Sequence, residues 1–122
     1  MNGRVAVSIA LIGIGVSGCG STQRAQRAES GSERSAPELM RQYGCPTCHV
    51  IPHVPGAVGK VGPSLASVNQ RSYLAGSLQN TPQNLHNWIM HPQHYEPGTA
   101  MPEMGVTDQD ATRIAHFLES NR

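Results

Sequence analysis

The chain contains few aromatic and few charged residues. Aromatic side chains make up 4% of its 122 residues and charged side chains 14%. The length allows one small domain, and such a domain is only marginally stable when apolar side chains alone build its core. The formal charge is +1, and without an excess of basic residues nothing favours nucleic acid as a partner.

Strand patterns and membrane-spanning runs are also missing. No stretch alternates apolar and polar residues as half-buried strands do. The apolar run from Val5 to Val16 is shorter than the roughly 20 residues that a membrane-spanning helix needs. The sequence therefore predicts an all-α domain.

That apolar run has the features of an export signal. Arg4 precedes it and small residues follow it. The segment Val16-Ser17-Gly18-Cys19 resembles a bacterial lipobox, so we expect residues 1–18 to be a lipoprotein signal peptide and Cys19 to be lipidated. Ordinary cleavage with a leftover thiol and an uncleaved anchor are the alternatives. Residues 19–34 are polar and small, which is typical of a flexible tether.

Three later segments carry helix signals, and together with the segments between them they make up a domain of residues 35–122. Each begins with a capping residue and continues with apolar positions at helical spacing. The capping signals are Ser35 with Glu38, Thr81 with Pro82, and Thr107 with Asp110. Glycine and proline predict loops over residues 50–63 and 91–105, and we expect a short helix or turn around residues 70–74.

The stretch Cys45-Pro46-Thr47-Cys48-His49 is the C-x-x-C-H pattern of covalent haem attachment. Two thiols at this spacing match the two vinyl groups of haem, and the adjacent histidine can reach the iron. A redox-active dithiol would need βαβ surroundings that are missing, and structural zinc would need four ligands. We therefore predict one covalently attached haem c, which would also supply the apolar volume that the small core lacks.

A second axial ligand is expected, because electron carriers usually bind the iron from both sides. Met101 and Met104 lie in the predicted loop before the last helix, whereas Met40 and Met90 fall on helix faces and fit the core better. Bis-histidine ligation is the alternative. Its candidates are His53, His86, His91, His94 and His116.

A family resemblance runs through the domain. It is carried by Cys45-Pro46-Thr47-Cys48-His49, Val61-Gly62-Pro63-Ser64-Leu65, Arg71-Ser72-Tyr73-Leu74-Ala75-Gly76, Asn80-Thr81-Pro82 and Thr99-Ala100-Met101-Pro102. Residues 35–122 resemble a class I cytochrome c domain, and are especially similar to those fused to subunit II of some haem–copper oxidases. The resemblance implies three to five helices around one haem.

The resemblance also implies roles for single residues. His49 and Met101 would be the axial iron ligands, and the Pro63 carbonyl would accept a hydrogen bond from the second ring nitrogen of His49. Leu65 would pack on the haem face. The candidates to bind the haem propionates are Arg71, Tyr73 and Trp88, which are otherwise ordinary core or surface residues.

These observations predict an electron carrier that performs no substrate chemistry. The expected partners are a cytochrome bc-type complex and a haem–copper oxidase or another terminal reductase, with a lipid anchor on the periplasmic face of a membrane. A fixed subunit of an oxidase is the first alternative, and a haem peroxidase or gas sensor with an open iron position is the second. A single lysine in the domain, Lys60, makes a basic docking ring impossible. We therefore expect docking through an apolar patch at the haem edge.

Overall fold

A computed structural model of the protein describes residues 33–121. The predicted signal peptide, the lipidation site Cys19 and nearly all of the predicted tether lie outside these residues. Within the described range, no helix combines the length and the apolar character needed to cross a membrane.

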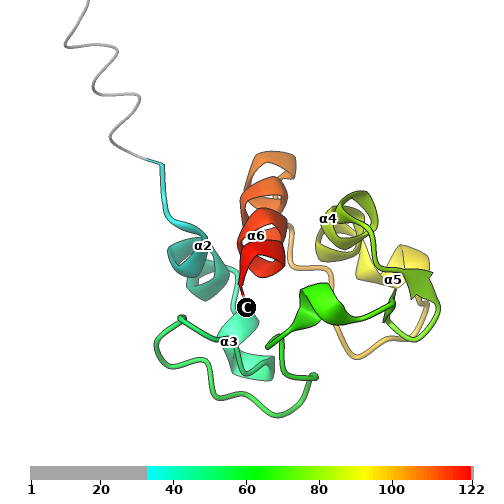
Figure 1. Cartoon of the computed structure of the whole chain (residues 1–122), viewed down its shortest axis with the longest axis horizontal. Helices are drawn as coiled ribbons and strands as arrows, with labels where there is room; N and C mark the ends of the chain where they lie inside the picture. Colours follow the sequence, from blue (N-terminus) through cyan, green and yellow to red (C-terminus); the bar gives the residue numbers. More distant parts are fainter. Residues whose placement is uncertain (1–32, 122) are drawn as a thin grey trace, which may run out of the picture. The chain divides into compact units, whose positions relative to one another are not determined.

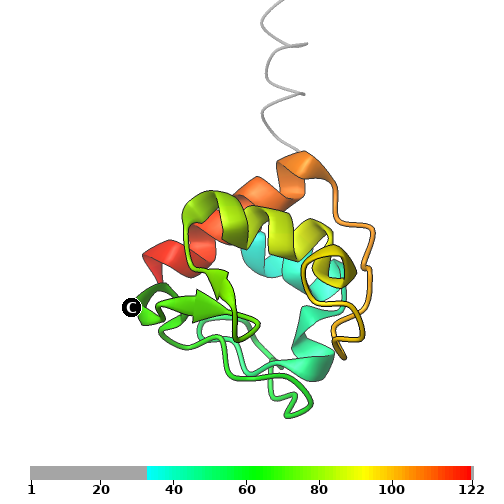
Figure 2. The same ribbon diagram turned by 90° about the vertical axis from the view of Figure 1, so that its right-hand side faces the viewer.

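The described residues form a mostly helical domain (Figure 1). Its elements are α2 (Ala36–Gln42), α3 (Cys45–Cys48), η1 (Val68–Gln70), β1 (Tyr73–Leu74), β2 (Leu78–Gln79), α4 (Pro82–Met90), α5 (Pro92–Tyr95) and α6 (Asp108–Ser120). Helices α2 and α4 both pack against α6 and lie on either side of it in Figure 1, while α3 and the β1–β2 hairpin lie below them. The turned view in Figure 2 shows α4 running beside α6.

The three predicted long helices are confirmed, and their first turns show why they start where they do. The Ser35 backbone N–H donates to the Glu38 carboxylate at 2.8 Å, which is half of a capping box. Thr81 Oγ1 accepts from the Asn84 amide at 3.1 Å, and Thr107 Oγ1 accepts from the Asp110 amide at 3.3 Å. These caps satisfy amides that have no partner within their helix.

Two stretches differ from the sequence-based expectation. The helix or turn expected at residues 70–74 is a 3₁₀ turn ending at Gln70, followed by a hairpin that pairs Leu74 with Leu78. Its strands have two residues each, too short for an alternating pattern to show. Part of the loop expected at 91–105 is the short helix α5, because Pro92 at its first position loses no helical hydrogen bond.

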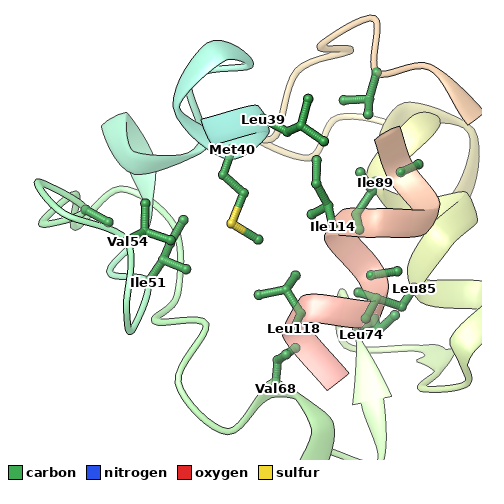
Figure 3. Close-up of a cluster of buried hydrophobic side chains, with 14 residues drawn as sticks. Leu39, Met40, Ile51, Val54, Val68, Leu74, Leu85, Ile89, Ile114 and Leu118 are labelled. Atoms are coloured by element: carbon green, nitrogen blue, oxygen red, sulfur yellow. The ribbon is translucent and has the colours of Figure 1, made fainter. Parts of the chain in front are cut away.

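The core is formed by side chains of α2, α4 and α6 together with the loop at residues 50–58. The isolated bridge between Val50 and Val58 closes this loop and turns Ile51 and Val54 inward. The buried apolar side chains are Leu39, Met40, Ile51, Val54, Ala57, Val68, Leu74, Leu85, Ile89, Val106, Ala111, Ile114, Ala115 and Leu118. Figure 3 shows Ile51 and Val54 on one side and Ile114 and Leu118 on the other, with the Met40 side chain pointing into the space between them.

Candidate haem site

The core surrounds a cavity of about 470 Å³. This volume falls within the range of about 300–1,000 Å³ that is typical of small-molecule and cofactor sites. Its walls come from α2, α4 and α6, from Cys45, Cys48 and His49, and from the loops at 61–71 and 99–106. Most lining side chains are apolar, so the cavity suits a large apolar group.

Both motif cysteines lie in the cavity wall on the single turn α3. The chain enters this turn through Gly44, whose φ of 79° is in the left-handed region that favours glycine. Burial raises the pKa of the Cys45 thiol above its ordinary value of 9.0, because burial disfavours the charged thiolate. The structure thus brings both thiols to one side of an apolar cavity.

His49 is held in one orientation at the end of that turn. Its Nδ1 lies 2.6 Å from the Pro63 carbonyl oxygen, which is the hydrogen bond expected from the sequence. A carbonyl oxygen only accepts hydrogen bonds, so Nδ1 carries the proton, and the lone pair of Nε2 is left to bind a metal. The Gly62 amide donates to the Cys48 carbonyl at 2.8 Å and brings the 62–63 backbone against the ring.

Three methionines line the same cavity: Met101, Met104 and the buried Met40. The first two are the candidates for the distal ligand. Both lie far from α3 in the sequence, and the fold brings them to the cavity that α3 also lines. Met101 as the iron ligand remains a prediction. Met40 belongs to the core, as expected, and is at the same time part of the cavity wall.

The other predicted site residues divide into two groups. Pro63, Leu65, Arg71 and Trp88 line the cavity, and the Arg71 guanidinium donates to the Ser64 carbonyl. Tyr73 does not line it, because its side chain is 58% exposed while Leu74 takes the inward position of β1. Tyr73 therefore lies outside the apolar cavity wall, and its contact with a haem propionate stays a prediction.

The five alternative histidines are not part of the cavity wall in the described residues. His86 lies beside the N-terminus of α6, with Nε2 3.2 Å from an Asp108 carboxylate oxygen. His91 Nδ1 lies 3.6 Å from Glu103 Oε2. Among residues 33–121, no group of three or more histidine, cysteine or acidic side chains is suited to bind a metal ion. A zinc site at Cys45 would therefore lack the ligands it needs.

Sequence reasoning did not identify most of the apolar cavity wall. The missed lining residues include Met40, Leu74, Leu85, Ile89, Val106, Ile114 and Leu118. Most of them are apolar positions of the three predicted helices, and the side chains that face the core also face the cavity. Gly62 was also missed, although it lies within the quoted Val61–Leu65 stretch.

The arrangement fits haem in several independent ways. Two thiols and a histidine with a free Nε2 share one wall, a thioether lies in the same cavity, and the lining is apolar. A Cβ added at Gly62 would lie 2.3 Å from His49 Cε1, so the backbone is shaped around this ring. These features define a helical, mono-haem protein of the c type.

The comparisons with known proteins agree with this class. The chain belongs to the cytochrome c family, whose profile matches residues 35–122. It therefore has the small cytochrome c fold, binds haem c covalently and is a haem electron carrier.

Two relatives are both called cytochrome c oxidase subunit 2. One, from Alkalihalophilus pseudofirmus, is 29% identical over 85 residues, which cover 68% of this chain and 24% of the relative. The other, from Bacillus subtilis, is 29% identical over 96 residues, which cover 75% of this chain and 27% of the relative. The chain thus spans about a quarter of the length of these relatives. No solved structure matches it.

Proposed function

We propose that the protein is a membrane-tethered cytochrome that passes single electrons in a respiratory chain, from a quinol-oxidising complex of the cytochrome bc type to a terminal oxidase or reductase. It carries out no substrate chemistry of its own. The main support is the cavity that has His49 and Met101 among its lining residues. Two protein ligands would fill both axial positions of the iron and leave none for a substrate.

The chain's own residues have clear tasks in this function. Haem, when bound, supplies the one-electron chemistry. Pro63 holds the His49 ring and keeps its Nε2 free, and this hydrogen bond increases the basicity of the ligand. Apolar side chains such as Leu65 and Ile114 keep water away from the site, so little reorganisation accompanies a change of charge.

An optical spectrum with two matched variants tests the proposal. We expect a low-spin c-type spectrum, a weak far-red methionine–iron band in the oxidised protein, and no reaction of the reduced protein with carbon monoxide. Met101→Ala should remove the band and admit carbon monoxide, while Met104→Ala should change neither. A high-spin spectrum or rapid carbon monoxide binding in the unaltered protein would instead indicate an enzyme or sensor.

Partner docking is proposed to use the exposed apolar residues at the cavity rim. Val61 lines the cavity and is also 74% exposed, and Val58, which precedes it in the sequence and does not line the cavity, is exposed to the same degree. We call Val58 and Val61 the apolar rim. Val61 lies where an electron would leave a haem in this cavity, and a partner that covers both valines would gain apolar contact area.

A fixed subunit of an oxidase is the second candidate, favoured by the two relatives that are named as oxidase subunits. Purification from membranes separates the two possibilities. Stoichiometric co-purification with an oxidase after a detergent and salt wash supports a fixed subunit. Recovery as a separate protein supports a shuttle.

The location is proposed from the N-terminal segment alone. Residues 1–18 would be removed as a lipoprotein signal, and lipidated Cys19 with the tether to residue 34 would hold the haem domain at the periplasmic face. Mass spectrometry of the mature N-terminus tests this. An unmodified Cys19 or an intact Met1 would contradict it.

A further inference from the structure

Gln93 on α5 is bonded to the loop that carries Met101. Its amide Nε2 donates to the Thr99 carbonyl at 2.8 Å and to the Met101 carbonyl at 2.9 Å. Its Oε1 accepts from the Gly98 amide at 3.2 Å. One side chain thus makes three hydrogen bonds to a stretch of four residues.

The loop is also held on the far side of Met101. Glu103 Oε1 accepts from the Gln93 backbone amide at 3.3 Å, and Glu103 Oε2 lies 3.6 Å from His91 Nδ1. The first turn of α5 therefore binds the chain both before and after the methionine. That turn is itself fixed, because Pro92 is among the largest fully buried side chains of the domain.

The chemistry requires an amide at this position. Two carbonyl oxygens need two N–H donors, and a neighbouring backbone N–H needs an acceptor. Glutamine supplies all three groups, whereas glutamate of the same shape supplies only acceptors and would place its charge against two carbonyl oxygens. The geometry is thus matched to the uncharged amide.

We propose that Gln93 is a positioning residue that holds Met101 in the cavity wall and so keeps the methionine on the iron. This inference rests on the proposed ligation by Met101. Its consequence is that the side chain of Gln93, which does not line the cavity, sets how often the methionine leaves the iron.

The test compares Gln93→Glu with a matched variant in the full-length haem protein. Asn80 makes the same pattern elsewhere, since its Nδ2 donates to the Val68 and Arg71 carbonyls, both at 2.8 Å. Asn80→Asp therefore removes two donors of the same kind without touching the loop that carries Met101. Gln93→Leu, which removes the donors without adding charge, is the second variant if the carboxylate hinders maturation.

Four measurements are made on each protein: the far-red methionine–iron band as a function of pH, the midpoint potential, the rate of carbon monoxide binding to the reduced form, and denaturant unfolding. For Gln93→Glu, which loses the two hydrogen bonds donated by Nε2, we expect the band to be lost about one pH unit lower than in the unaltered protein and carbon monoxide to bind about tenfold faster. Gln93→Leu, which loses all three hydrogen bonds, should change both at least as much. The midpoint potential should also fall. Asn80→Asp should lower stability and leave the far-red band and the carbon monoxide rate unchanged. Its potential is not compared, because its partners Val68 and Arg71 line the cavity.

The outcomes separate this inference from the function beneath it. If the unaltered protein lacks the methionine–iron band, the ligation by Met101 is wrong and the inference falls with it. If the band is present but the Gln93 variants behave like Asn80→Asp, with lower stability and an unchanged band and carbon monoxide rate, then Gln93 is only structural and the inference alone is overturned.

Discussion

At the scale of single residues, Gly62 shows most directly how the backbone is built around the proximal ligand. A Cβ added there would lie 2.3 Å from Cε1 of the His49 ring, 2.7 Å from its Nδ1 and 2.9 Å from its Nε2. Real Cβ contacts are essentially never this short, so either the ring or the 62–63 backbone must move. Both movements disturb the hydrogen bond between His49 and Pro63.

Gly62→Ala should therefore weaken the iron–histidine bond and destabilise the haem protein by about 1–3 kcal/mol, as overpacking usually does. The measurements are the yield of haem-loaded protein, its spin state and its unfolding midpoint. Gly56→Ala is the control. Gly56 has a φ of 80° with nothing within 4 Å of an added Cβ, so that variant pays only for backbone strain. An unchanged spectrum in Gly62→Ala would show that the packing is not tight.

At the scale of elements, one hydrogen bond joins the first long helix to the last. Tyr43 follows directly after α2, and its hydroxyl donates to Asp110 Oδ2 in α6 at 2.7 Å. Asp110 was predicted as the second half of a capping box with Thr107, yet its carboxylate turns to Tyr43 while its amide meets Thr107 Oγ1. Asp110 is only 8% exposed, so its carboxylate depends on this donor.

Tyr43→Phe should lower the free energy of unfolding by about 1.5–3 kcal/mol, the usual range for a hydrogen bond to a charged group. Denaturant unfolding of the haem protein measures it. Tyr73→Phe is the matched control, because the 58% exposed Tyr73 should tolerate the change within about 0.5 kcal/mol. Equal losses in the two variants would mean that the bond between α2 and α6 contributes nothing.

The first turn of α2 predicts a pH dependence. Hydrogen bonds from the Ser35 backbone and side chain hold the pKa of the Glu38 carboxyl below its ordinary value of 4.5. A depressed pKa in the folded state stabilises the fold above the unfolded-state pKa, and this contribution is lost as the pH falls through the folded-state pKa. Glu38→Gln should thus be less stable than the unaltered protein at neutral pH, and the two should converge well below pH 4.5. A constant difference in unfolding midpoint across this range would contradict the prediction.

The elements also show what sequence reasoning can and cannot reach. Helices α2, α4 and α6 were predictable because their caps, such as Thr81 before Pro82, are local signals. The hairpin and α5 were missed because two-residue strands and a four-residue helix carry too little pattern. The bonds of Gln93 and Asp110 to distant backbone or side chains depend on the fold, and no local pattern reveals them.

At the scale of the whole molecule, the scarcity of aromatic residues and the cavity explain one another. Buried side chains such as Met40 and Leu118 belong to the hydrophobic core and also line the cavity. A domain with so few large side chains gains most of its missing apolar contact from the haem, so core packing and haem binding are one property of this fold.

The charge of the whole domain governs how it meets its partners. From residue 35 onward, the basic residues are Arg41, Lys60, Arg71, Arg113 and Arg122, against the acidic residues Glu38, Glu96, Glu103, Asp108, Asp110 and Glu119. This near balance provides no strong field to steer an encounter, whereas the proposed apolar rim of Val58 and Val61 would offer exposed apolar contact area.

Electron transfer from the reduced protein to oxidase-containing membranes should therefore depend weakly on salt. Between about 0.01 M and 0.15 M ionic strength the Debye length falls from about 30 Å to about 8 Å, which strongly weakens docking driven by surface charge. We expect the stopped-flow rate to change by less than about threefold over this range. Val61→Ser should slow the reaction at every ionic strength, because it removes exposed apolar area. Lys60→Gln, which removes the neighbouring charge and keeps the bulk, should leave the rate unchanged. A steep fall with salt, or a larger effect at Lys60 than at Val61, would mean that charge and not the apolar rim brings the partners together.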